Sequence, residues 1–311
     1  MISLFLSSLG LGTAITLASS HWFLAWAGLE ISTLAIIPLM SAPHHPRAVE
    51  AATKYFLIQA TAAATLLFAA TSNAWLTGQW TMHLTTHPIS LTMALLALCL
   101  KIGLAPLHTW MPDVLQGLSL MNAMILSTWQ KLGPFALLLQ LPLENQPALV
   151  LMGVLSAVIG GLGGLNQTHL RKIMAYSSIA HLGWMMIVMQ FFPSLTLLTL
   201  VLYLIMTLAM FLTLNTTSST TINTLSTSWS TAPILAVLSP LVLLSLGGLP
   251  PLLGFLPKWL ILHELTKQDM PATATIMAMS ALLSLYFYLR LSYAVSLTLS
   301  PAPLSQSTLW R

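Results

Sequence analysis

Long apolar segments separated by short polar connections make up almost the whole chain. About 20 consecutive apolar residues in a helix cross the hydrocarbon core of a bilayer. By this criterion the sequence predicts ten spans, at residues 2–19, 22–41, 52–72, 90–116, 120–142, 147–165, 171–190, 194–214, 232–266 and 271–297. We therefore expect an all-α polytopic membrane protein without a soluble domain.

A motif of eleven residues occurs twice inside these apolar segments. Residues 103–113 (GLAPLHTWMPD) and 248–258 (GLPPLLGFLPK) share glycine, leucine, proline, an aromatic residue and a second proline at the same offsets. Each copy has a lysine close by, Lys101 before the first and Lys258 at the end of the second. Matched interruptions of this kind in two membrane helices are typical of internal repeats around an ion site.

The prolines of the motif predict broken helices. Proline removes one N–H donor and leaves the carbonyl four residues earlier without its helical partner. Pro106 would thus free the carbonyl of Ile102, and Pro251 that of Gly247. In hydrocarbon, such backbone is tolerated only where it is buried in protein or lines a hydrated cavity. The expected interruptions, including a lesser one at Gly133-Pro134, involve Pro106, Pro134, Pro250 and Pro251.

The order of the spans predicts the arrangement of the two halves. Each broken segment lies in the fourth span of a run of five, and five is odd, so the second run enters the membrane from the opposite side. We expect two inverted repeats, residues 1–142 and 147–297, followed by a polar C-terminal tail at 298–311. Lysine and arginine favour the side of the N-terminus by five to one, with Arg47, Lys54, Arg171, Lys172 and Arg311 against Lys267.

Composition supports this class and excludes others. Of the 311 residues, 57% are hydrophobic and 5% are charged, whereas soluble domains average about 25% charged residues. The net charge of +4 is small and dispersed, so no nucleic-acid partner is indicated. The single cysteine, Cys99, excludes internal disulfides and cysteine-ligated clusters. No metal-ligand cluster, phosphate-binding loop or nucleophile–base pair is visible, so these residues alone cannot catalyse a redox reaction.

Four ionisable residues lie well inside the predicted spans: Glu30, Lys101, Lys131 and Lys258. A charge at mid-membrane costs about 2.5–3.5 kcal/mol on insertion scales, and such residues are functional by default. The alternative is one structural ion pair, but it would leave two lysines without an acidic partner. Burial lowers the pKa of an amine and a nearby carboxylate raises it. A lysine that a carboxylate can approach or leave is therefore a switchable proton carrier.

Histidines provide further candidates for a proton relay along a hydrated file. His181 lies in mid-span after Ser177 and Ser178, and His108 lies within the first broken segment. A hydrogen-bonded structural role is the alternative for both. Asp113 and Glu144 fall near membrane edges, where a surface role is the simpler interpretation and proton entry or exit the other.

Several motifs that contain these residues closely resemble one known family. They are Gly28–Glu30, Lys101–His108, Ser127–Lys131, Gly163–Gln167, Arg171–Trp184, Gly247–Pro251 and Pro257-Lys258. The sequence resembles mitochondrial NADH–ubiquinone oxidoreductase chain 2 over residues 1–311. The resemblance implies an antiporter-like membrane subunit of respiratory complex I in the inner mitochondrial membrane, with the N-terminus on the matrix side.

By this resemblance, the buried residues correspond to a proton path. Glu30 matches the coupling glutamate and Lys101 its partner, while Lys131 matches the central lysine and Lys258 the outer lysine of the second half-channel. The family also implies that FMN, iron–sulfur clusters and ubiquinone belong to other subunits. Its partners would be other membrane-arm subunits, including neighbouring antiporter-like subunits, and lipids.

The sequence departs from the family at its C-terminus, where members usually continue into one more apolar helix, so we expect a partial sequence that lacks this helix. Two other functions remain open. One is a stand-alone cation/proton antiporter, which the same lysine and glutamate residues would serve. The other is an inert scaffold, although such a bundle gains nothing from the cost of buried lysines.

Overall fold

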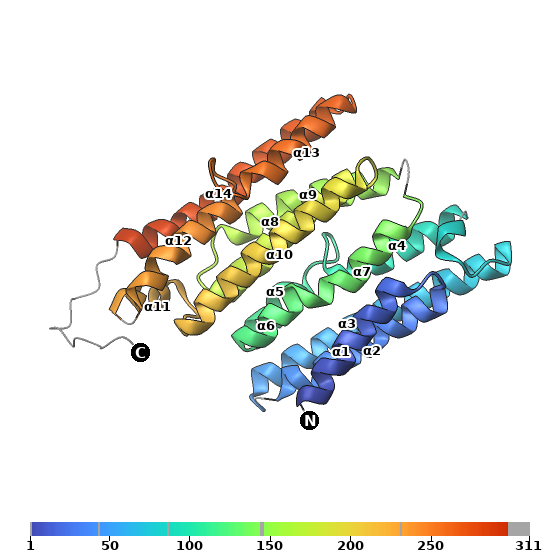
Figure 1. The fold of residues 1–311 in the computed structure, drawn as a ribbon, viewed down its shortest axis with the longest axis horizontal. Helices are drawn as coiled ribbons and strands as arrows, with labels where there is room; N and C mark the ends of the chain where they lie inside the picture. Colours follow the sequence, from blue (N-terminus) through green and yellow to red (C-terminus); the bar gives the residue numbers. More distant parts are fainter. Residues whose placement is uncertain (1, 43, 86, 144–145, 231, 298–311) are drawn as a thin grey trace.

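The computed structural model describes residues 2–42, 44–85, 87–143, 146–230 and 232–297. These residues form fourteen α-helices and two short 3-10 helices, which confirms the all-helical class (Figure 1). The first seven α-helices are α1 (Ile2–Ala18), α2 (Trp22–Ser41), α3 (Pro46–Thr77), α4 (Pro88–Ile102), α5 (Trp110–Gly117), α6 (Leu120–Ser127) and α7 (Trp129–Gln140). The other seven are α8 (Pro147–Gly164), α9 (Leu170–Met189), α10 (Pro193–Thr216), α11 (Ile222–Ser226), α12 (Pro233–Gly247), α13 (Phe255–Lys267) and α14 (Pro271–Leu297).

Proline and hydropathy together explain where these helices begin and run. Six of them, α3, α4, α8, α10, α12 and α14, begin with proline, whose fixed φ suits the first helical position. Within the described residues, α2, α3, α8, α10 and α14 are long and apolar enough to cross a membrane. The expected tail at 298–311, together with Glu144 and Arg311, lies outside the described residues.

The two predicted breaks of the repeated motif are confirmed. Irregular segments separate α4 from α5 and α12 from α13. Gly103 and Gly248 end the first helix of each pair in the left-handed conformation, with φ of 84° and 83°, which glycine adopts at little cost. The peptide bonds before Pro106 and Pro251 are both cis.

The interruption predicted at Gly133-Pro134 is wrong. Pro134 lies inside α7, and the chain leaves the helix earlier, at Thr128 between α6 and α7 (φ −115°, ψ −70°). The ring of a proline conflicts with the carbonyl four residues before it, which is that of Gln130. In the structure the interruption lies upstream of both Gly133 and Pro134, before the start of α7, and Pro134 is accommodated inside the helix as Pro38 is in α2 and Pro240 in α12.

Each half of the chain packs with the same pattern. In the first half α1 packs on α2 and α7, and α3 packs on α2, α4 and α5; in the second α8 packs on α9 and α14, and α10 packs on α9, α12 and α13. Figure 1 shows the two groups side by side, with long helices running in similar directions. Contacts of α5 and α6 with α9 and α10 join the halves.

Two short backbone bridges, one in each half, show the same equivalence of the halves outside the helices. His21 before α2 pairs with Thr81, which follows α3, and His169 before α9 pairs with Thr221, which follows α10. Two backbone hydrogen bonds accompany each bridge. The second and third long helices of each half are thus tied together at one end in the same way.

Candidate functional site

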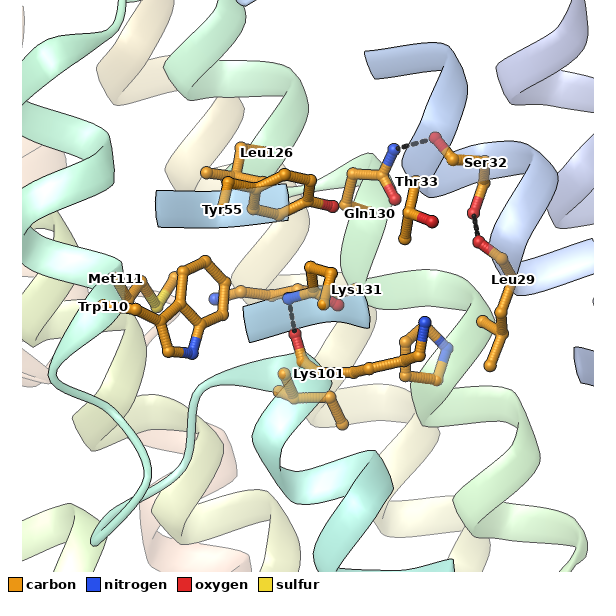
Figure 2. Close-up of a pocket in the computed structure, with 13 residues that line it drawn as sticks. Leu29, Ser32, Thr33, Tyr55, Lys101, Trp110, Met111, Leu126, Gln130 and Lys131 are labelled. Atoms are coloured by element: carbon orange, nitrogen blue, oxygen red, sulfur yellow. Dashed lines mark hydrogen bonds between the residues drawn. The ribbon is translucent and has the colours of Figure 1, made fainter. Parts of the chain in front are cut away.

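A small cavity lies among α2, α3, α4, α5, α6 and α7 in the first half. Its volume of about 10 Å³ is close to the space that one water molecule needs. Figure 2 shows Lys101 and Lys131 between the rings of Tyr55 and Trp110 on one side and Leu29 of α2 on the other. The structure thus brings two of the predicted lysines to one cavity.

Lys101 is an unpartnered ammonium at the end of a half-helix. Its side chain lies in the last turn of α4 and is buried, and its Nζ has no hydrogen-bond partner among the described residues. Neutral side chains occupy the nearby free carbonyls, since Gln59 Nε2 donates to the carbonyl of Lys101 at 3.3 Å and Trp110 Nε1 to that of Leu100 at 3.2 Å. The sequence had indicated the next carbonyl, that of Ile102.

Glu30 is half-buried on α2 beside this cavity, where its neighbours Leu29 and Thr33 form part of the lining. Thr33 Oγ1 donates to its carboxylate at 3.4 Å. No ion pair within 4.0 Å in the described part of the chain includes Glu30. The structural ion pair considered from the sequence is therefore not formed here.

Lys131 connects the two halves through a tyrosine that sequence reasoning missed. Its buried Nζ donates to the hydroxyl of Tyr203 on α10 at 2.9 Å. That hydroxyl donates in turn to the carbonyl of Ser127 at 3.2 Å, which the interruption at Thr128 leaves without its helical partner. The sequence signal was a single tyrosine within the apolar segment 194–214.

A second small cavity, of about 20 Å³, lies on the other side of Tyr203. Tyr203, His181 and Lys258 all line it, and the rings of His181 and Tyr203 lie 5.6 Å apart. Lys258 Nζ donates to the carbonyl of Gly247 at 2.7 Å. This carbonyl is the one that Pro251 was predicted to free.

These contacts define the order in which the polar residues follow each other from the first cavity to the second. Lys101 lines the first cavity with Glu30 beside it, Lys131 and Tyr203 connect this cavity to the second, and His181 and Lys258 line the second. His108 stands apart, because it lines neither cavity and its Nδ1 lacks a hydrogen-bond partner among the described residues. Within the same described residues, no group of three or more His, Cys, Asp or Glu side chains could hold a metal ion.

Sequence comparison identifies the family. The family described as "NADH:quinone oxidoreductase/Mrp antiporter, TM" matches residues 19–284, and "NADH dehydrogenase subunit 2 C-terminus" matches residues 285–311. NADH-ubiquinone oxidoreductase chain 2 of Tetraodon nigroviridis is 68% identical, over 97% of this chain and 86% of the relative. The chain belongs to the NADH-ubiquinone oxidoreductase chain 2 family. The chain 2 of Salmo salar is 64% identical over 100% of this chain and 89% of its own length.

Solved structures have the same fold as this chain. A chain of respiratory complex I from Thermus thermophilus with bound aureothin matches at a TM-score of 0.87 and 30% identity, over 94% of this chain and 70% of that one. A chain of the Mrp complex from Dietzia sp. DQ12-45-1b has the same fold, with a TM-score of 0.84 at 18% identity, over 94% of this chain and 60% of that one. The family resemblance is confirmed, and the chain is an antiporter-like, multi-pass membrane subunit of NADH:ubiquinone oxidoreductase.

Proposed function

We propose that this subunit carries protons across and along the inner mitochondrial membrane through its buried polar row. The row consists of Glu30, Lys101, Lys131, Tyr203, His181 and Lys258. The observation that carries the proposal is the hydrogen bond from Lys131 to Tyr203, because it connects the cavity of Lys101 with the cavity of Lys258. His108 stays a separate candidate in the first broken segment.

The chemistry follows from the cost of burying charge. An ammonium without a partner in an apolar interior gains from losing its proton, whereas a carboxylate nearby stabilises its charged form. Lys101 has no hydrogen-bond partner in the described part of the structure and would hold its proton only while Glu30 is close and ionised. Loss of the charge of Glu30, or its movement away, would thus favour release of the Lys101 proton, which would then affect the protonation of Lys131. Groups linked in this way would titrate as a set.

Two inverted repeats would place these lysines around one midplane. The equivalent packing of the two halves and the matched bridges at His21 and His169 support such repeats. If α4 with α5, α6 with α7, and α12 with α13 each make one crossing, the chain crosses the membrane ten times. The repeats would then be the predicted 1–142 and 147–297.

The location and partners follow from the family and the charges. The excess of lysine and arginine on the N-terminal side favours the matrix for that side, with Arg311 outside the described residues. FMN, iron–sulfur clusters and ubiquinone would belong to other subunits, and this chain would contact neighbouring antiporter-like subunits and lipids. The free energy released by NADH oxidation would reach this chain through the other subunits of the complex.

Replacing members of the row in the assembled complex tests the proposal. Lys131→Ala or Glu30→Ala should lower NADH-driven proton pumping while the complex still assembles, since each removes a proton-carrying or coupling group. Proton uptake by sealed vesicles, measured per NADH oxidised, gives the result. Unchanged pumping with normal assembly would favour a scaffold role. Gradient-driven ion exchange by the purified chain without NADH would favour a stand-alone antiporter.

A further inference from the structure

A polar surface pocket lies between the first two turns of α3 and the end of α5. Its volume is about 270 Å³, and its lining residues are Arg47, Glu50, Ala51, Lys54, Asp113, Gln116 and Gly117. Lys54 Nζ lies 2.7 Å from Glu50 Oε1 and 4.0 Å from Asp113 Oδ2. The three charged side chains are half-exposed. With Arg47 the pocket has two cations and two carboxylates, so it concentrates titratable groups without a net formal charge.

The length of α3 places this pocket at the water boundary. The 32 residues of α3 extend about 48 Å at 1.5 Å per residue, which exceeds the hydrocarbon thickness of about 30 Å. Arg47, Glu50 and Lys54 all lie near the N-terminus of α3, so its first turns are the part that reaches beyond the apolar core. A Cβ on Gly117 would lie 2.6 Å from Ala51 Cβ and 2.7 Å from the carbonyl oxygen of Arg47. The absent side chain lets α5 lie directly against α3 at this pocket.

The line of contact between α3 and α5, here called the seam, runs from the surface pocket to Lys101. Ala51, Tyr55 and Gln59 follow each other at four-residue spacing, so they share one face of α3 at successive depths. On α5, Trp110 lies one turn from Asp113. A turn advances about 5.4 Å, and Tyr55, Gln59 and Trp110 line the cavity that contains Lys101. The surface pocket and the inner cavity are therefore neighbours along this seam.

Two aromatic side chains line the inner cavity on the side of the surface pocket, one helical turn inward from it. Tyr55 and Trp110 are both buried, and their rings lie 5.8 Å apart with planes inclined at 59°. The indole is fixed by its hydrogen bond to the carbonyl of Leu100 at 3.2 Å. Tyr55 lies one helical turn from Ala51 and Trp110 one turn from Asp113, so the ring pair stands between the surface pocket and the inner cavity, and the indole must release the carbonyl of Leu100 before it can turn.

We infer that this surface pocket is the mouth through which protons reach Lys101, with the rings of Tyr55 and Trp110 as its gate. The inference rests on the proposed function and adds the point of exchange with water. Glu50 and Asp113 place carboxylates at the mouth, and Lys54 lies between them, with its Nζ 2.7 Å from Glu50 Oε1 and 4.0 Å from Asp113 Oδ2. The neighbouring Arg47 balances the charge of the pocket. After the ammonium of Lys101 has given its proton toward Lys131, opening of the ring pair passes one proton inward to the neutral amine.

Blocking the pocket in the assembled complex tests this inference. Gln116→Cys places a thiol in the lining without changing its charges, and a trimethylammonium thiosulfonate reagent then fills the space. Thr53→Cys, on an exposed face of α3 outside the lining, is the matched control, and the treated wild-type complex sets the background. Labelling at position 116 should remove the share of NADH-driven pumping that Lys131→Ala removes, and labelling at position 53 should remove none.

Two further measurements separate blockage from other effects. A small uncharged methylthio label at position 116 should leave pumping intact, and full labelling of Gln116→Cys in the Lys131→Ala background should cause no additional loss. Full pumping after labelling at 116, while Lys131→Ala still reduces it, would overturn the mouth and leave the row standing. An additional loss in the double variant would also overturn it. Normal pumping by Lys131→Ala would reject the proposed function itself.

Discussion

The two broken helices have the same backbone conformation at the break, but different groups donate hydrogen bonds to the carbonyls there. In the first, Gln59 and Trp110 occupy the carbonyls near the end of α4, and the ammonium of Lys101 has no partner in the described structure. In the second, Lys258 reaches back from α13 and its ammonium itself binds the carbonyl of Gly247. The same kind of break therefore leaves Lys101 without a hydrogen bond in the described structure and holds Lys258 by one.

The difference assigns different tasks to the two lysines. The ammonium groups lie at the C-terminal ends of α4 (Lys101) and α12 (Lys258, which reaches back from α13). The dipole of a helix favours a positive charge at this end. Lys101 can respond to Glu30 because no hydrogen bond must break first. Lys258 must give up a 2.7 Å charge-assisted hydrogen bond before it moves. In our account the first lysine responds to coupling and the second holds its proton until a neighbour displaces it.

Removing each amine gives the largest contrast in stability. Lys258→Met leaves the carbonyl of Gly247 buried without a donor, which costs about 1–3 kcal/mol. Lys101→Met leaves the carbonyls near it paired and removes an unpartnered charge, so its stability should be equal to or above that of the wild type. Thermal inactivation of the assembled complex measures both. Equal loss of stability in the two variants would contradict the comparison.

Adding a methyl group at each left-handed glycine sharpens the same contrast. Gly103→Ala and Gly248→Ala should each cost about 1–2 kcal/mol in backbone strain. The new Cβ at position 248 would lie 3.0 Å from Cδ and 3.1 Å from Nζ of Lys258, whereas at position 103 the nearest atoms are Sδ of Met111 at 3.2 Å and Cζ2 of Trp110 at 3.3 Å. Gly248→Ala should therefore displace the ammonium of Lys258 and lower proton pumping per electron, and Gly103→Ala, which presses on Met111 and Trp110 and not on a lysine, should lower it less. The reverse order would show that Lys258 is not held as described.

Hydropathy and proline predicted most of the fold because both act locally. The span 22–41 coincides with α2 and 271–297 with α14, and the breaks at Pro106 and Pro251 were visible in the repeated motif. The segment 52–72 fell short of α3, since hydropathy detects only the part of a helix that lies in hydrocarbon. Its polar first turns, with Glu50 and Lys54, line the surface pocket.

The sequence predicted which residues are unusual but not which of them meet. The buried lysines were conspicuous because charges are rare in apolar segments. Tyr203 and Gln59 were missed, since a tyrosine or glutamine in a membrane helix is unremarkable until its neighbouring helix is known. The interruption expected at Pro134 was misplaced because a proline can lie inside a helix, as Pro134 does in α7, Pro38 in α2 and Pro240 in α12. Helix packing across the two halves decides these contacts.

The most direct measurement asks whether the hydroxyl of Tyr203 connects the two halves. Tyr203→Phe keeps the buried ring and removes only the oxygen that accepts from Lys131. Tyr176→Phe, which lines neither cavity, is the control. In sealed vesicles that contain the assembled complex, Tyr203→Phe should reduce protons pumped per NADH oxidised to the level of Lys131→Ala, and Tyr176→Phe should not reduce it. A normal ratio in Tyr203→Phe would contradict the account.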